Sequence, residues 1–188
     1  MIEYAQKMAN WESWMPEYRF GAFYIFPPDD VIKPIDALRK RYDPKSDAIC
    51  QAHISLSESL AKPLADADIE ELRTILSGIQ PFTITYGPLR DFPPHPGVCY
   101  RIEPEENVRK LRNAIHTASC FHRILLRREH IAPHMTVAEF ISVEDTKELL
   151  HELSGKVPEG TFLCDEIECA VPDESFYFKR VLRLPLGR

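Results

Sequence analysis

Residues 51–59 read QAHISLSES, and residues 132–140 read APHMTVAEF. Each stretch contains a histidine, an apolar residue, a hydroxyl residue and a second apolar residue, and the two histidines, His53 and His134, are 81 residues apart. Because alternate side chains of a β-strand share a face, each tetrad predicts a strand that turns its histidine and hydroxyl to one side and its apolar residues to the core. Two such tetrads in one chain predict a duplicated structural unit.

The sequence after each tetrad repeats the same order of elements. Residues 66–79 (DADIEELRTILSGI) and 142–156 (SVEDTKELLHELSGK) both have helical periodicity and a glycine near the C-terminal end. Strand-like segments follow 29 residues after the first histidine, at Phe82, and 28 residues after the second, at Phe162. We therefore expect an α+β fold with two pseudo-symmetric lobes, each an antiparallel sheet with outer helices, and an active-site cleft between them.

The remaining segments fit this plan. Residues 18–26 are rich in aromatic side chains and predict a buried strand, whereas residues 31–42 and 107–118 predict helices. The chain lacks the regular alternation of strands and helices that is typical of a doubly wound parallel sheet. We expect residues 1–17 to be an N-terminal extension and residues 18–188 to form a single bilobal domain.

Composition and charge limit the possible functions. The chain is 44% hydrophobic and 28% charged, with a net charge of −6. No apolar run reaches the roughly 18 residues that a membrane helix needs, and we expect a cytoplasmic monomer with no membrane association and no protein partner. The five cysteines form no CxxC pair, which argues against a disulfide scaffold or a zinc knuckle. Long nucleic acid is usually held by a basic surface, so a small or short anionic ligand fits this charge better.

Two histidines and two hydroxyl groups around one cleft suit the chemistry of a phosphate ester. A neutral imidazole can take a proton from the attacking hydroxyl or water, and a protonated imidazole can give one to the leaving oxygen. Ser55 and Thr136, two residues after His53 and His134, can donate hydrogen bonds to phosphoryl oxygens. This chemistry requires neither a metal nor another cofactor.

At these residues the sequence resembles the 2H phosphoesterase superfamily, which includes bacterial 2′-5′ RNA ligases and cyclic nucleotide phosphodiesterases. The resemblance spans approximately residues 18–186. It implies that His53 and His134 are the catalytic acid and base and that Ser55 and Thr136 orient the phosphate, without a metal ion. It also implies a substrate that is a nucleotide or short RNA with a 2′,3′-cyclic phosphate or a 2′-5′ linkage.

The chain departs from the family pattern at two positions. Ala52 precedes the first histidine where the family often has proline, and Glu139 stands in the region where a basic residue often follows the second motif. Strict strand alternation predicts that Glu139 points away from His134.

Further candidates for ligand contacts come from the predicted strands and loops. An aromatic ring could stack on a base, and an arginine could contact a phosphate. These candidates are Tyr24, Phe92, Tyr100, Arg101, Tyr177 and Arg180. For each of them a core or surface role is an open alternative.

Two groups of potential metal ligands have simpler explanations. Glu129, His130 and His134 have nearly helical spacing. Pro133 argues against a continuous helix through them. Residues 116–122 contain two histidines and a cysteine, but no matching partner is recognisable elsewhere, so we interpret them as a helix end.

Two other classes of function stay open at this point. The same cleft could bind a nucleotide or an RNA end without turnover, or the chain could be a structural protein that keeps the fold. The sequence also leaves open the base preference and the direction of the reaction, hydrolysis or ligation.

Overall fold

The computed structural model describes residues 2–91, 95–122, 124–127 and 130–187. The helices are α1 (Asp29–Tyr42), α2 (Pro44–Asp47), α3 (Asp66–Ser77), α4 (Glu105–Ile115) and α5 (Val143–Leu153), with 3-10 turns at Met15–Tyr18 and Ser119–Phe121. The strands are β1 (Ala22–Ile25), β2 (Ile54–Ser55), β3 (Phe82–Asp91), β4 (Gly97–Glu103), β5 (His134–Glu139), β6 (Gly160–Cys164), β7 (Glu166–Pro172) and β8 (Phe178–Pro185).

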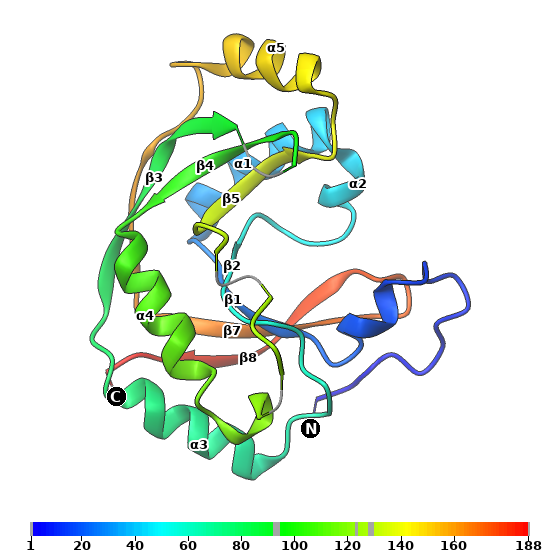
Figure 1. The fold of residues 1–188 in the computed structure, drawn as a ribbon, viewed down its shortest axis with the longest axis vertical. Coiled ribbons are helices and arrows are strands. Elements are labelled where there is room, and N and C mark those ends of the chain that lie inside the picture. The colour runs from blue at the N-terminus through cyan, green and yellow to red at the C-terminus, as the bar shows by residue number, and fades with distance from the viewer. Residues whose placement is uncertain (1, 92–94, 123, 128–129, 188) are drawn as a thin grey trace.

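The strands form two four-stranded sheets, as the repeated pattern predicts (Figure 1). Sheet A has the order β2-β1-β7-β8 and sheet B the order β5-β4-β3-β6, and neighbouring strands are antiparallel throughout. The two motif strands, β2 and β5, are each the edge strand of their sheet. Cα atoms of these two edge strands come within 8 Å of each other, so both motifs lie where the sheets meet. The prediction of an α+β fold with two antiparallel sheets is confirmed.

The sequence repeat does not correspond to two separate halves of the chain. The segments that begin near Phe82 and Phe162 are β3 and β6, which are hydrogen-bonded neighbours in sheet B, with Ile84 opposite Phe162. By place in the sheet order, the counterpart of β3 is β7 in sheet A. Matching offsets along the chain therefore identified repeated elements but not the sheet in which each strand lies, because the chain crosses between the sheets.

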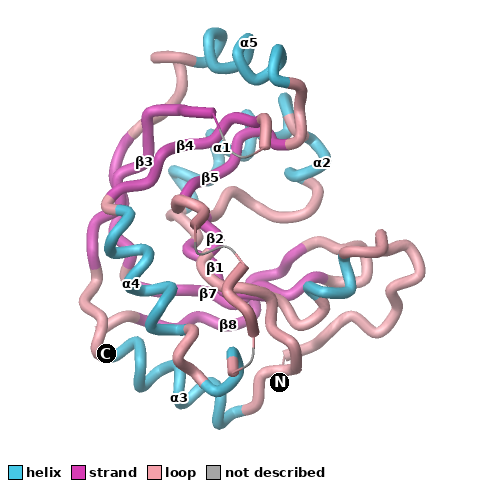
Figure 2. Tube along the Cα trace, viewed as in Figure 1, coloured by secondary structure: helices cyan, strands magenta, loops and turns pink. Residues whose placement is uncertain are grey.

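The helices cover the faces of the sheets that form the core. Helix α1 contacts β5 and helix α5 contacts β3 and β4 of sheet B, whereas α3 contacts β8 of sheet A and packs beside α4 (Figures 1 and 2). The apolar members of both tetrads are fully buried in one continuous core: Ile54, Leu56, Met135 and Val137. The histidines and hydroxyl residues between them are only half-buried. This alternation is the one that the tetrads predict for strands with one face on the core.

The segment that precedes β1 packs against the other face of sheet A. It is mostly irregular, with one 3-10 turn (Figure 2). Met15 belongs to a small apolar cluster with Tyr24, Phe176 and Phe178. The indole Nε1–H of Trp11 donates to a backbone carbonyl after β7 at 3.1 Å. Among the described residues, no helix has the length and apolar character that a membrane crossing needs.

Candidate active site

The two histidines occupy matching positions at the inner edges of the two sheets. His53 directly precedes β2, which pairs with β1 so that Ser55 lies opposite Tyr24. His134 begins β5, which pairs with β4 so that His134 lies opposite Arg101. Because β2 and β5 approach each other at the junction of the sheets, the structure brings both motifs to one site.

The two imidazole rings are oriented in the same way. Nδ1 of His53 lies 2.7 Å from the carbonyl oxygen of Gln51, and Nδ1 of His134 lies 2.8 Å from that of Ala132. In both cases the carbonyl belongs to the residue two positions before the histidine. A carbonyl oxygen can only accept, so Nδ1 carries the hydrogen and the lone pair of the neutral ring is on Nε2. Both rings are therefore held in the neutral tautomer in which Nε2 is unprotonated and able to accept a proton.

Aromatic side chains pack around His53. The rings of Tyr24 and Phe26 lie 4.8 and 5.9 Å from the His53 ring, measured between centroids. Tyr24 is only 6% exposed, so most of its ring supports the histidine and its apolar neighbours. Sequence reasoning included Tyr24 but missed Phe26, although Phe26 follows Tyr24 by two residues and strand alternation turns it to the same side.

An arginine–glutamate pair lies beside this aromatic group. The Arg180 guanidinium forms two hydrogen bonds with the carboxylate of Glu168, one of them 2.8 Å long, and its Cζ lies 4.8 Å from the centroid of the Phe26 ring. Glu168 is 2% exposed and lies opposite Tyr24 in the register of β1 and β7. The hydrogen bond with Glu168 raises the pKa of Arg180, so this side chain stays cationic. Arg180 is therefore a cationic guanidinium on the His53 side of the site whose charge is paired with that of Glu168.

On the second motif, the candidate Arg101 lies on the same face as His134. The two residues are direct partners in the register of β4 and β5, and side chains of such partners project to one side of a sheet. Arg101 is half-exposed and forms an ion pair with Glu103. The structure thus brings Arg101 and Arg180 to opposite sides of the paired motifs.

The prediction that Tyr100 contacts a ligand is wrong. Tyr100 lies opposite Met135 in the register, is fully buried in the core and packs against Tyr86. One residue of strand alternation separates it from Arg101 and turns it to the opposite face. Phe92, its alternative in the same region, lies outside the described residues.

Tyr177 lies in the connection between β7 and β8 and is half-buried. Burial raises the pKa of its hydroxyl, with smaller contributions from Cys50 and Asp36. The next residue, Phe178, donates its N–H to the Ile49 carbonyl at 2.8 Å, which places this connection beside the segment that leads to His53. A ligand contact of Tyr177 stays a prediction.

The prediction that Glu139 points away from the second histidine is also wrong. Thr136 lies opposite Cys99, but Glu139 lies opposite Gly97, so β5 uses three residues where β4 uses two. This β-bulge turns two consecutive side chains, Val137 and Ala138, to the core and returns Glu139 to the face of Thr136. Strict alternation fails because a bulge inserts one residue into the count.

Polar groups of α2 and its N-cap hold Glu139 in this place. Its carboxylate accepts a hydrogen bond from the Ser46 hydroxyl at 3.3 Å, and its N–H donates to the Asp43 carboxylate at 3.0 Å. Both partners lie at the start of α2, the short helix before the first motif. A negative charge therefore stands at the end of β5, beside the second motif.

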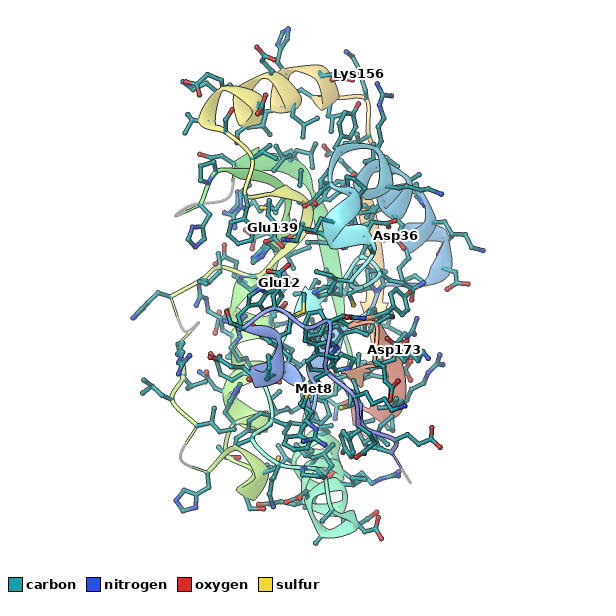
Figure 3. All side chains as sticks on the ribbon, turned by 90° about the vertical axis from the view of Figure 1, so that its right-hand side faces the viewer. Met8, Glu12, Asp36, Glu139, Lys156 and Asp173 are labelled. Atoms are coloured by element: carbon teal, nitrogen blue, oxygen red, sulfur yellow. The ribbon has the colours of Figure 1, made fainter. Side chains whose placement is uncertain are left out.

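The N-terminal segment borders the same region. The carboxylate of Glu12 lies 3.5 Å from the Lys45 ammonium on α2, and that of Glu17 lies 3.6 Å from the Arg127 guanidinium. Figure 3, which views the molecule from the right-hand side of Figure 1, shows Glu12 between Glu139 and Asp173. This segment therefore bridges chain regions that precede the first and the second motif.

Potential metal ligands and nucleophilic cysteines do not gather at the site. The described part of the chain contains no group of three or more histidine, cysteine, aspartate or glutamate residues placed to hold a metal ion. Both ring nitrogens of His116 form hydrogen bonds within the fold, with the Arg112 carbonyl at 2.7 Å and the Glu58 N–H at 3.2 Å. Glu129 lies outside the described residues. All five cysteines are buried, and burial raises the pKa of each thiol, to about 11 or about 12.

Comparisons with known proteins agree with this geometry. Residues 27–175 match the family described as the 2′-5′ RNA ligase superfamily. A protein of Bacillus cytotoxicus, provisionally named as a phosphoesterase, is 30% identical over 136 residues, which cover 70% of this chain and 76% of the relative. A protein of Oceanobacillus iheyensis with the same provisional name is 28% identical over 132 residues, covering 69% of this chain and 75% of the relative.

Solved structures show the same fold. The crystal structure of E. coli LigT in its apo form has a TM-score of 0.56 and 16% sequence identity, covering 89% of this chain and 96% of LigT. The structure of LigT with 3′-AMP has a TM-score of 0.54 and 15% identity, covering 89% and 96% of the two chains.

Proposed function

Since the chain belongs to the 2′-5′ RNA ligase superfamily, we propose that it is a metal-independent 2H-type phosphoesterase whose two catalytic histidines are His53 and His134. Its substrate would be a nucleotide or short RNA with a 2′,3′-cyclic phosphate or a 2′-5′ phosphodiester. The observation that carries this proposal is the matched orientation of the two imidazole rings, each with Nδ1 on the carbonyl two residues before it.

The reaction on a 2′,3′-cyclic phosphate needs two proton transfers. Nε2 of one neutral histidine takes a proton from water while the water oxygen forms a bond to phosphorus. Nε2 of the other, protonated histidine gives its proton to the ribose oxygen whose bond to phosphorus breaks. Each step is general acid–base catalysis of the kind that imidazole performs near neutral pH. The products are a phosphate monoester and a free ribose hydroxyl.

The neighbouring polar groups would stabilise the phosphoryl oxygens. Ser55 and Thr136 share the strand faces of His53 and His134, and their hydroxyl groups can donate to the non-bridging oxygens. Arg101 and Arg180 bring guanidinium groups, each paired with a glutamate, to the two sides of the site. Preorganised donors of this type act where charge develops in the transition state.

Two features favour a short, modestly charged substrate. The chain has a net charge of −6, and Glu139 brings a carboxylate to the face of the second motif. A phosphate chain near Glu139 would be repelled, whereas a single cyclic phosphate between the histidines would not. LigT itself has been crystallised with 3′-AMP, with ATP and with NADP+, which supports nucleotides as the ligand class.

Turnover assays with purified protein test this proposal. We expect hydrolysis of at least one 2′,3′-cyclic nucleotide or 2′-5′-linked oligomer, and we expect it to persist in EDTA. His151→Ala is a matched control, because His151 is exposed on α5 and lies outside both motifs. Nucleotide binding without turnover over the whole panel would support a binding module instead, and loss of turnover in EDTA that a divalent ion restores would overturn the metal-independent mechanism.

A further inference from the structure

Two arginines are buried between the elements that carry the motifs. Arg39 on α1 and Arg112 on α4 are 2% and 7% exposed. Burying a guanidinium is costly unless its N–H groups are hydrogen-bonded. Both guanidinium groups donate to backbone carbonyl oxygens that lie in or directly before the two motifs.

Arg39 connects the approach to the first histidine with the strand of the second. Its Nη2 donates to the Cys50 carbonyl at 2.8 Å, and its Nη1 donates to the Thr136 carbonyl at 3.1 Å. Cys50 precedes His53 by three residues, and Thr136 follows His134 by two. One guanidinium therefore binds the backbone just before the first motif and the backbone of the second motif.

Arg112 makes the same connection with the two motifs exchanged. Its Nη1 donates to the Ile131 carbonyl at 3.4 Å, and its Nη2 donates to the Ser55 carbonyl at 3.2 Å. Ile131 precedes His134 by three residues, and Ser55 follows His53 by two. The four bonds thus obey the pseudo-two-fold relation between the lobes.

We propose that Arg39 and Arg112 are a reciprocal pair of positioning residues that fix the two histidine motifs relative to each other; this inference rests on the proposed two-histidine function. A guanidinium is a planar fork, so two carbonyls that share one are held at a defined separation. Each fork joins the backbone before one histidine to the backbone after the other. Loss of either fork would let the acid and the base drift apart while leaving the groups that touch the substrate unchanged.

Kinetics of conservative variants test the pair. Arg39→Lys and Arg112→Lys keep the positive charge but lose the fork. A misplacement of about 1 Å can reduce catalysis by about 10²-fold, so we expect kcat for a 2′,3′-cyclic nucleotide to fall by about that factor. KM should change by less than about threefold, because binding contacts are kept. The control is Arg41→Lys on the same helix, whose guanidinium is exposed and pairs with Glu152 at 3.4 Å; it should behave as wild type.

A second measurement does not depend on turnover. In backbone amide NMR spectra, Arg39→Lys should shift the resonances of Thr136 and Val137 in the second motif, and Arg112→Lys should shift those of Ser55 and Leu56 in the first. Shifts that stay within α1 and α4 would overturn the proposal, as would unchanged kcat in both folded variants or a change in KM alone. If the wild-type protein turns over no substrate, the proposed function fails, and the NMR spectra still decide whether the arginines tie the motifs together.

A milder variant covers the case in which the lysine variants do not fold. Asp36 lies with its carboxylate 3.5 Å from Nε of Arg39 and accepts the Ala52 N–H at 2.7 Å. Asp36→Asn keeps an oxygen acceptor for Ala52 but removes the charge beside the guanidinium. We expect a smaller fall in kcat, about threefold to tenfold, with amide shifts at Thr136, and no shift at Thr136 would contradict the proposal.

Discussion

The two histidines share one backbone frame but have different neighbours. His53 is surrounded by the rings of Tyr24 and Phe26, and the N-terminal segment closes the far side of the same cluster through Met15. His134 lies opposite the half-exposed Arg101 on a strand face with exposed hydroxyl residues. These exposed residues on sheet B are Thr83, Thr85 and Thr161.

This difference shows which part of the site the symmetry controls. The carbonyls that bind Nδ1 of each histidine and the two buried arginines are repeated in both motifs. The fold therefore sets the positions of the two Nε2 atoms. The side chains around each ring do not repeat, so the two histidines have different surroundings. In the proposed mechanism, these different neighbours distinguish the acid from the base, although both stand on copies of one motif.

The largest expected effect comes from removing either histidine. His53→Ala and His134→Ala should each reduce turnover by about 10²–10⁴, the usual contribution of a general acid or base. The double variant should be little worse than either single one, because groups that act as a unit are not additive. Rates measured on folded variants check this. Near wild-type turnover in either single variant would contradict the proposal that one histidine is the acid and the other the base.

The two arginines on opposite sides of the site should respond differently to substitution. Arg101→Gln removes a half-exposed charge and should raise KM by about tenfold, the equivalent of one charge-assisted hydrogen bond. Arg180→Gln leaves the buried carboxylate of Glu168 with less compensation, so it should lower the melting temperature as well. Glu168→Gln in the Arg180→Gln background should recover part of the lost stability. Equal effects of both arginine variants on KM and stability would show that the two sides are equivalent.

A smaller effect is expected at the bulge of β5. Glu139→Gln should lower KM for substrates that carry a second phosphate by a few-fold, because it removes a like charge from the face of Thr136. KM for a substrate with only a cyclic phosphate should hardly change. The measurement is the ratio of the KM values for the two substrates. A ratio that is the same in Glu139→Gln and wild type would mean that Glu139 does not affect binding of the second phosphate.

The smallest effect concerns stability at low pH in the connection between β7 and β8. Burial opposes ionisation of Asp173, but hydrogen bonds from Ser175, Lys179 and the backbone of Tyr177 outweigh it and lower the pKa to about 2. A carboxylate with a lowered pKa stabilises the folded state above its ordinary pKa and loses this contribution as the pH falls towards 2. Asp173→Asn should therefore lower the melting temperature slightly at pH 7, and the difference from wild type should shrink between about pH 4 and pH 2. A difference that stays constant over this range would rule out the ionised carboxylate as its cause.

The sequence predicted the features that depend on local alternation. The buried apolar residues of the tetrads, the half-buried histidines and the α+β class with two antiparallel sheets all follow from periods of two and 3.6 residues. The tetrads also indicated the site, since the motif strands meet at the junction of the sheets. The catalytic roles of His53 and His134 stay predictions.

Features that depend on tertiary arrangement were not predictable in this way. The bulge before Glu139 changes the face of a residue without any glycine or proline within β5 to mark it, and Tyr100 differs from Arg101 only by its place in the alternation. Arg39 and Arg112 look like ordinary polar residues of amphipathic helices. Their role depends on carbonyl groups 11 to 97 residues away, which no local pattern contains.

The crossing of the chain between the sheets bears on how such a protein can be assembled. Residues 2–91 supply β1 and β2 to sheet A but β3 to sheet B, and residues 95–187 are divided between the sheets as well. A chain of half this length could complete neither sheet, and two copies would have to exchange strands, as in a domain-swapped dimer. The protein is thus the single-chain equivalent of a symmetric dimer with one histidine from each subunit. Unlike the subunits of a homodimer, the two repeated units of this chain can differ in sequence. This difference permits aromatic rings around one histidine and an arginine opposite the other.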